Sequence, residues 1–241
     1  MTMSDIFFIT GTDTGVGKTV AASWLAFAAS KKRKTALIKP MQTGTIAPKL
    51  EGDEAFYRKA LPETVTVSTF SSLDEPLAPF IAAYRSFQTL DLEFLVEQSL
   101  AISTTHDISF FEGAGGFLVP ITESQNMADY ARQLEARIIL VARPDLGTLN
   151  HTILTIEAIE QRNLKLDFLV ISGFPVQADV VHWENIRFLG SYFPNLPILI
   201  LGWIDVSAPS AIQEMDVKFY NRKPSFLQDL AISPFTIPEN I

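Results

Sequence analysis

The chain has 241 residues, 47% of them hydrophobic and 19% charged, which is typical of a globular protein and excludes a disordered one. Its formal net charge of −8 disfavours nucleic acid as a partner, because a phosphate backbone favours basic surfaces. The absence of cysteine excludes a disulfide scaffold, a thiolate zinc site and a cysteine nucleophile.

The apolar runs along the chain are short. The first run, Ile6–Ile9, is too short for a secretory signal. Later runs such as 138–142 and 198–201 have the length of strands and are far below a membrane span. We therefore expect a cytoplasmic protein with no membrane partner.

Short apolar runs alternate with longer helical patterns, which indicates βαβ units and a mostly parallel sheet. The expected strands are 6–10, 35–39, 107–112, 137–142, 166–172 and 197–202. The expected helices are 18–31, 53–60, 91–104, 125–135, 149–162 and 178–192. Because the strands are apolar on both faces, the prediction is an α/β fold of three layers, with helices on both faces of the sheet. We expect a single domain over 1–241.

The connecting segments differ from these elements in composition. Residues 40–52 and 63–90 are rich in Pro, Thr and Ser, and we expect them to be long surface loops. The segment 208–241 has weak periodicity and several prolines, so we expect it either to wrap around the domain or to fray. In parallel sheets, ligands lie at the carboxyl ends of the strands, so the residues that follow each strand are the candidate site.

The first expected strand continues directly into a glycine-rich loop that ends in Lys18 and Thr19. Glycines and the N-terminus of the next helix supply the converging N–H groups that a phosphate needs. Lys18 is expected to reach the β- and γ-phosphates and the Thr19 hydroxyl to hold Mg²⁺. The spacing departs from the common one, because Thr12 stands where the first glycine is usual. The loop predicts nucleotide binding and a P-loop NTPase fold, with loop residues Thr12, Asp13, Thr14, Gly15, Val16, Gly17, Lys18 and Thr19 as contacts.

The second expected strand ends in Lys39, which Pro40 follows. At this position Lys39 would point into the same crevice as Lys18. Two ammonium groups beside a triphosphate suit phosphoryl transfer, which depends mainly on positioning and charge stabilisation. A solvated lysine at a strand terminus is the alternative, and the neighbouring phosphate loop favours the functional role.

Two carboxylates are candidate Mg²⁺ ligands. Glu112 ends the third expected strand and precedes the glycine-rich stretch 113–116. Asp53 stands at an expected helix start, where a plain N-cap role is an equally good interpretation. Mg²⁺ prefers oxygen ligands, often one or two carboxylates together with phosphates and water, so both residues suit a metal beside the loop.

The remaining candidates carry weaker signals. The turn at 143–150, after the fourth strand, precedes a helix start whose free N–H groups could bind a carboxylate. From the residues alone, an ordinary strand-to-helix turn is the better interpretation. We expect structural roles for the histidines and packing roles for the tryptophans, which are His106, His151, His182, Trp24, Trp183 and Trp203.

In combination, these segments resemble the dethiobiotin synthetase family. The matching stretches are Gly11–Thr19, Lys39-Pro40 with Thr43-Gly44, Glu112–Gly116, and Leu146-Gly147 with Asn150-His151. The resemblance implies a homodimer that uses ATP and Mg²⁺. It also implies the reaction: CO₂ from bicarbonate adds to an amine of 7,8-diaminononanoate, the carbamate takes the γ-phosphoryl group to form a carbamic-phosphoric anhydride, and the second amine closes a ureido ring.

The resemblance also implies a role for each matching residue. Lys39 becomes the catalytic lysine, acting with Lys18. Mg²⁺ ligands are implied at Thr19, Asp53 and Glu112. Further nucleotide contacts are implied at Gly113, Ala114, Gly115, Ser172, Asp205, Val206 and Ser207. Substrate contacts are implied at Thr43, Gly116, Leu146, Gly147 and Asn150. The Leu-Gly-x-x-Asn turn would come from the neighbouring subunit, so the plain turn becomes an expected anion site at the subunit interface.

The sequence departs from the family at the base-binding end. Ser172-Gly173 stands where many members have an Asn-Asp pair that reads adenine. The stretch 205–207 stands where the family often has Pro-Trp-Leu. We therefore expect ATP to work, with weaker discrimination against other nucleoside triphosphates.

Two alternatives share the expected fold. Ligases of the cobyrinic acid amide-forming kind normally carry a glutaminase domain with a cysteine nucleophile, and this chain has no cysteine. ParA- or MinD-like ATPase switches usually have a lysine early in the loop, where Asp13 stands here. Many of them end in a basic amphipathic helix, which the stretch 233–241 cannot form.

Overall fold

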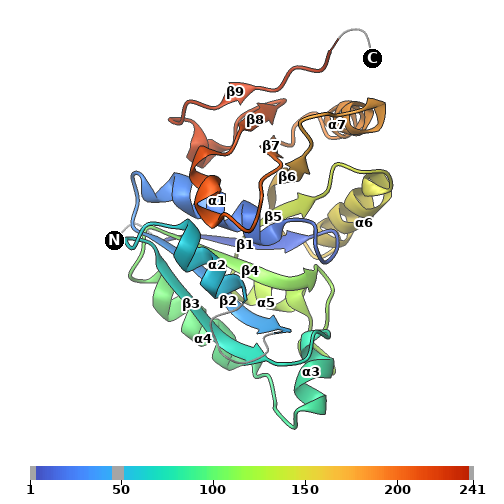
Figure 1. Cartoon of the computed structure of the whole chain (residues 1–241). Coiled ribbons are helices and arrows are strands. Elements are labelled where there is room, and N and C mark those ends of the chain that lie inside the picture. Colours follow the sequence, from blue (N-terminus) through green and yellow to red (C-terminus); the bar gives the residue numbers. More distant parts are fainter. Residues whose placement is uncertain (1–3, 45–51, 239–241) are drawn as a thin grey trace.

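The computed structural model describes residues 4–44 and 52–238. Its centre is a nine-stranded sheet with the order β3-β2-β4-β1-β5-β6-β7-β8-β9 (Figure 1). The strands are β1 (Asp5–Gly11), β2 (Thr35–Thr43), β3 (Thr66–Leu73), β4 (Ile108–Gly116), β5 (Arg137–Ala142), β6 (Leu166–Phe174), β7 (Ile198–Gly202), β8 (Val217–Tyr220) and β9 (Ser233–Pro234). Among the strands that the structure describes, β7 and β8 alone pair antiparallel, so the predicted mostly parallel sheet is confirmed.

Helices lie between almost all successive parallel strands, as βαβ units require. The α-helices are α1 (Lys18–Ser30), α2 (Asp53–Ala60), α3 (Pro79–Arg85), α4 (Leu92–Ser103), α5 (Met127–Gln133), α6 (Thr148–Glu160) and α7 (Val180–Tyr192). Two short 3₁₀ helices, η1 (Pro209–Glu214) and η2 (Ser225–Leu227), follow β7. Among the residues that the structure describes, none of the helices has the length and apolar composition to cross a bilayer.

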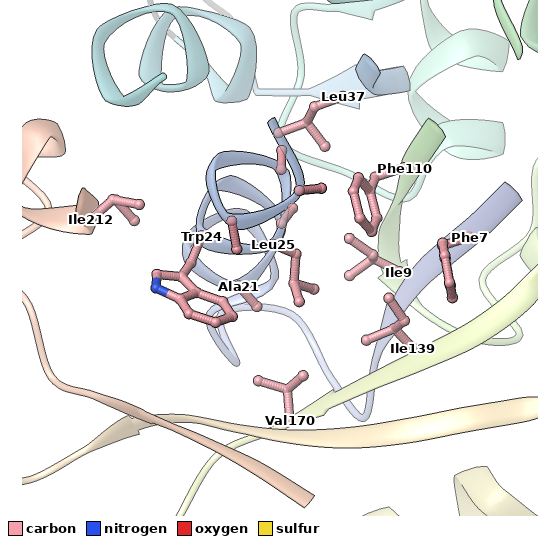
Figure 2. Close-up of a cluster of buried hydrophobic side chains, with 14 of the residues drawn as sticks. Phe7, Ile9, Ala21, Trp24, Leu25, Leu37, Phe110, Ile139, Val170 and Ile212 are labelled. Atoms are coloured by element: carbon pink, nitrogen blue, oxygen red, sulfur yellow. The ribbon is translucent and has the colours of Figure 1, made fainter. Parts of the chain in front are cut away.

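The strands are buried on both faces, which divides the core into layers. In β5, Ile139 packs with α1 and Leu140 packs with α6 and α7 on the opposite face. Figure 2 shows the first of these layers, with Leu25 of α1 among side chains of the central strands. This alternation is the period-two pattern of a strand that is covered on both sides, and it confirms the three-layer α/β fold.

The central strand β1 positions the phosphate loop. It pairs with β4 on one side and β5 on the other, and Ile9 lies opposite Glu112 in the register with β4. The loop leaves the carboxyl end of β1 and enters α1 at Lys18. Residues that follow the neighbouring strands are thereby brought to the same edge of the sheet.

The prediction of long loops was wrong in two places. Within 63–90 the structure has strand β3 and helix α3. Strand β3 is at the sheet edge and largely polar, with only Val67 and Leu73 buried, so it lacks the apolar run of an inner strand. Strand β2 also continues past Pro40 to Thr43. The proline is tolerated because it has no N–H to pair and because the pairing of β2 with β4 ends at Ile38, before the proline is reached. The stretch 45–51 lies outside the described residues.

The segment after β7 extends the sheet. Strand β8 adds antiparallel to β7, and β9 adds to β8. Ile212 of η1 is buried on the side of the sheet that α1 covers, where it belongs to the same core cluster as Trp24 (Figure 2). The expected packing role holds for Trp24 but is wrong for Trp203, whose side chain is 64% exposed after the end of β7.

Candidate active site

A cavity of about 380 Å³ lies at the carboxyl edge of the sheet, between the phosphate loop and the ends of β2 and β4. Its lining residues are Thr14, Gly15, Gly17, Lys18, Thr19, Val20, Lys39, Gln42, Thr43, Asp53, Glu112, Ala114, Gly115 and Val206. All but Val20 and Gln42 are residues that the sequence singled out. The prediction that these distant segments meet at one edge of the sheet is therefore confirmed.

The loop is held by a backbone contact with β5 and by the side chain of Lys18. The Thr12 N–H donates to the Val141 carbonyl at 2.9 Å, which ties the loop to β5. Gly17 has a φ of 89° and is the N-cap of α1, with no side-chain cap bond. Lys18 Nζ donates to the Asp13 carbonyl oxygen at 3.0 Å, so the ammonium lies over the loop. The N–H groups at the start of α1 thereby face the cavity without a side-chain competitor.

Lys39 is the centre of a buried ion cluster. Its Nζ lies 2.6 Å from Asp53 Oδ2 and 2.7 Å from Glu112 Oε1. The third ammonium proton is donated to the Gly113 carbonyl oxygen at 3.2 Å. Lys39 and Glu112 are almost fully buried, and Asp53 is 29% exposed. The cluster joins β2, β4 and α2, and it keeps one ammonium between two carboxylates.

The pKa values in this cluster follow from burial and charge. Burial alone would lower the pKa of Lys39, but Glu112 and Asp53 outweigh it and leave the pKa raised. Burial alone would raise the pKa of Asp53, but the Lys39 ammonium holds it below its usual range. Burial raises the pKa of Glu112, and the neighbouring Asp53 adds to this effect. Lys39 therefore stays charged at neutral pH, with Asp53 as an ionised partner.

Lys18 has the opposite behaviour. Burial lowers the pKa of its ammonium and outweighs the Glu112 carboxylate, which raises it, and the nearby Lys39 lowers it further. Lys18 and Lys39 bring two ammonium groups to one cavity, and the anionic oxygens of a polyphosphate are ligands that suit them.

Asp53 does not act as an N-cap. Gly52 is the N-cap of α2, and Asp53 is its first helical residue, with its side chain on Lys39 and Thr19. The plain capping interpretation is therefore wrong. The carboxylate reaches across the cavity instead, where it could contact a metal.

Thr19, Asp53 and Glu112 present oxygen atoms to one point. Thr19 Oγ1 lies 2.8 Å from Asp53 Oδ1 and 3.1 Å from Glu112 Oε1. In the described ranges, no group of three or more His, Cys, Asp or Glu residues could hold a metal ion by itself. A hydroxyl with two carboxylates is, however, a donor set that suits Mg²⁺ when phosphate oxygens complete the shell. The residues present fit this ion.

Tyr57 is a site residue that the sequence reasoning missed. It lies one turn after Asp53 on α2, is fully buried, and donates a hydrogen bond to Glu112 Oε2. Burial raises the pKa of the phenol, and the Glu112 carboxylate raises it further, so the hydroxyl keeps its proton and acts as a donor. The i, i+4 spacing from Asp53 was the available signal, because it puts both side chains on one helix face.

Replacing Tyr57 with phenylalanine should lower the free energy of unfolding by about 1–3 kcal/mol, because a buried carboxylate oxygen of Glu112 loses its donor. Urea unfolding of both proteins measures the difference. Tyr84→Phe is the control, because Tyr84 is 74% exposed and its hydroxyl can bond to water. Equal stability of Tyr57→Phe and the wild type would contradict a supporting role for this hydrogen bond.

Several predicted site residues do not line the cavity. Val16 is 3% exposed, and its side chain belongs to the core. Gly113 is buried and contributes its carbonyl to Lys39. The others outside the lining are Thr12, Asp13, Gly116, Ser172, Asp205, Ser207, Leu146, Gly147 and Asn150.

At Ser172 and at 205–207, where the sequence predicts contacts with the nucleotide base, the polar groups are engaged locally. Ser172 is 5% exposed, and its Oγ lies 3.5 Å from the Gly17 carbonyl oxygen. The Asp205 side chain accepts from the Ser207 N–H at 2.9 Å, within its own turn. Val206 lines the cavity with an apolar side chain. Of these residues, none presents a free amide or carboxylate pair like the one expected in the family.

The turn before α6 lies outside the lining of the cavity. Leu146 is 81% exposed, and Gly147 is the N-cap of α6 with a φ of 91° and no side-chain cap bond. Asn185 holds the turn by donating to the Pro144 carbonyl at 2.8 Å. The turn that leads into α6 is therefore exposed at Leu146, and the helix start has no capping side chain.

Comparison with known proteins identifies relatives over most of the chain. A family model described as an AAA domain matches residues 5–210. An ATP-dependent dethiobiotin synthetase of Rhodococcus erythropolis is 40% identical over 75% of this chain and 80% of its own length. The synthetase of Bacillus licheniformis is 33% identical over 87% of this chain and 90% of its own length. The synthetase of Anaeromyxobacter dehalogenans is 36% identical over 81% of this chain and 89% of its own length.

Solved structures show the same fold at low identity. A ParA family ATPase from Chlorobium tepidum has a TM-score of 0.57 at 8% identity, over 88% of this chain and 92% of its own. The ATP complex of a Cyanothece McdA variant has a TM-score of 0.55 at 11% identity, over 89% of this chain and 88% of its own. At these identities the likeness shows the P-loop NTPase fold alone, so it adds no functional weight to the ATPase-switch alternative.

Proposed function

Because this chain belongs to the dethiobiotin synthetase family, and is accordingly an ATP-dependent ligase that forms C–N bonds, we propose that its reaction is the carboxylation and ring closure of 7,8-diaminononanoate. The products are dethiobiotin, ADP and phosphate. The observation that carries this proposal is the position of Lys39. Its ammonium lies between Asp53 and Glu112 in the cavity that the phosphate loop lines.

The proposed reaction has three bond-forming steps. First, an amine of the substrate attacks CO₂ and loses a proton, which gives a carbamate. Next, a carbamate oxygen attacks the γ-phosphorus of ATP, and ADP leaves, which gives a carbamic-phosphoric anhydride. Last, the second amine attacks the carbonyl carbon, the bond from that carbon to the phosphate oxygen breaks, and phosphate leaves. The second and third steps develop negative charge on oxygens that fixed cations can stabilise.

The cations of the cavity suit these steps. Lys18, at the loop, would contact the β- and γ-phosphates. Lys39 would exchange one of its present oxygen partners for an oxygen of the carbamate or of the transferring phosphoryl group. Both lysines are held before substrate arrives, by the Asp13 carbonyl and by the two carboxylates, so little reorganisation is needed in the transition state.

Thr19, Asp53 and Glu112 would hold Mg²⁺. When bound, this ion neutralises phosphate charge and orients the γ-phosphoryl group. Tyr57 supports the set, because its hydrogen bond orients Glu112 from the side remote from Lys39.

The substrate carboxylate would bind at the start of α6 in a partner subunit. Leu146, Gly147 and Asn150 lie outside the cavity of their own chain, which supports a role in a neighbouring site. An uncapped helix start favours an anion. In a homodimer, mixing inactive Lys39→Ala and Asn150→Asp subunits should restore about a quarter of the wild-type activity, because each mixed dimer keeps one intact site. A mixture that stays inactive would contradict the shared site.

We expect the site to discriminate weakly between nucleotide bases. Ser172 and Asp205 are engaged with the protein, and Val206 offers only apolar contact. Sites that hydrogen-bond a ligand group reject analogues by 10⁴–10⁵, whereas apolar sites reject them by about 10². We expect kcat/KM for ATP to exceed that for GTP and CTP by less than about 10³. Steady-state rates with the three nucleotides test this, and a preference above a thousandfold would contradict it.

The direct test is incubation with diaminononanoate, bicarbonate and Mg-ATP, followed by mass detection of the product. We expect dethiobiotin and an equal amount of phosphate, with both dependent on the diamine. Omission of Mg²⁺ should abolish both. Phosphate released equally without the diamine would contradict the proposal and favour an ATPase switch.

A further inference from the structure

Gln42 is a polar cavity residue to which the proposed reaction has so far given no role. Its side chain is only 9% exposed although it lines the cavity. The amide Nε2 donates to Ser72 Oγ at 2.9 Å. The amide Oε1 is buried and, among the residues that the structure describes, has no hydrogen-bond partner. An unpaired buried acceptor is destabilising unless a ligand completes it.

The backbone of β2 explains why Gln42 faces the cavity. Ile38 and Met41 belong to the same core cluster although they are three residues apart, so the period-two alternation is broken at Pro40. Lys39 and Gln42 therefore both line the cavity side. Gln42 also lies opposite Ser72 in the register with β3. The Ser72 hydroxyl accepts the hydrogen bond of the amide nitrogen, and the amide oxygen is left without a partner among the described residues.

The chemistry of the cavity limits which ligand can complete this acceptor. Phosphate, carbamate and carboxylate oxygens are themselves acceptors and cannot donate to Oε1. The two lysines are engaged elsewhere, Lys18 on Asp13 and Lys39 on its three oxygen partners. An amine of the substrate carries N–H donors and suits the position.

We propose that Gln42 Oε1 accepts a hydrogen bond from the amine that closes the ring, and so makes Gln42 a positioning residue for the last step. This inference rests on the proposed function. A neutral amide suits the task because a nucleophilic amine must be uncharged, and a carboxylate in its place would favour the protonated form. Gln42 exchanges no proton. The amine nitrogen attacks the carbonyl carbon, phosphate leaves with the bonding electrons, and the amine proton passes to solvent.

Calorimetric titration of the full chain with diaminononanoate tests the role. Gln42→Met keeps the length of the side chain and removes the acceptor, so we expect diamine affinity to fall about tenfold. ADP affinity should be unchanged. In turnover, the ratio of phosphate released to dethiobiotin formed should rise above one, because the anhydride is hydrolysed when the second amine is misplaced. A merely structural role would leave this ratio unchanged.

Two further variants keep the test decisive. Gln42→Glu retains an acceptor, so diamine affinity should be kept while ring closure at neutral pH slows. Gln161→Met is the matched control, because Gln161 is exposed at the end of α6. Wild-type diamine affinity and coupling in Gln42→Met would overturn the inference, as would an equal loss of ADP and diamine affinity. A wild-type protein that binds no diamine would overturn the proposed function itself.

Discussion

Lys39→Ala is expected to lower turnover by on the order of 10²–10³, the loss found when one preorganised electrostatic donor is removed from an active site. The Lys39 ammonium is expected to stabilise the negative charge of the carbamate and then that of the transferring phosphoryl group. Its pKa is raised by Glu112 and Asp53 against the effect of burial, so it is charged throughout the neutral range. Steady-state product formation with saturating ATP and diamine measures the loss.

The controls for Lys39 separate chemistry from folding. ADP affinity of Lys39→Ala should be close to that of the wild type, because Lys18 and the loop are untouched. Lys39→Met fills the volume of the stem and should be as inactive as Lys39→Ala. Lys34→Ala, which changes an exposed side chain at the opposite end of β2, should keep full activity. Near-normal turnover of Lys39→Ala would refute its catalytic role.

Gly17→Ala is expected to weaken ATP binding by on the order of 10², because displacement of converging groups by about 1 Å has effects of this size. A Cβ at this position would lie 2.3 Å from Ser172 Oγ and 2.9 Å from Ser172 Cβ. The φ of 89° is also in the left-handed region, which disfavours alanine. Both effects move the N–H groups that surround the phosphate. Titration with ATP measures the affinity.

Gly15 provides a matched control within the same loop. It also has a positive φ, of 76°, but an added Cβ would meet no atom within 4 Å. Gly15→Ala should therefore lose no more than about tenfold in ATP affinity, the part due to backbone strain alone. Adding Ser172→Gly to Gly17→Ala should restore part of the binding. Equal losses in the two glycine variants would show that contact with Ser172 is unimportant.

Much of the candidate site could be predicted because parallel sheets impose a simple rule. Residues after the strands converge at one edge, so Lys39 and Glu112 could be placed beside the loop before any coordinates were known. Asp53 could be nominated from its helix start but not separated from a cap. That decision needed the contact with Lys39, which spans 14 residues of sequence and depends on how α2 packs.

Other parts of the fold carried no comparable signal. Strand β3 is polar because it is at the sheet edge, so it has no apolar run to reveal it. In a strand that alternates regularly, Gln42 and Lys39 would lie on opposite faces, because they are three residues apart. The break at Pro40 reverses this and brings both side chains to the cavity, which the sequence reasoning did not anticipate.

The amino-acid sequence by itself determined the phosphate loop, the second lysine and the family to which the chain belongs. These features are local, since glycine spacing, an apolar strand and a helix start act over a few residues. Only the tertiary structure decided that Lys39 is shared between two carboxylates and that Tyr57 holds Glu112. It also decided that Leu146 lies outside the cavity of its own chain. Such pairings join residues far apart in the chain, so they depend on the sheet order and on burial, which no local pattern contains.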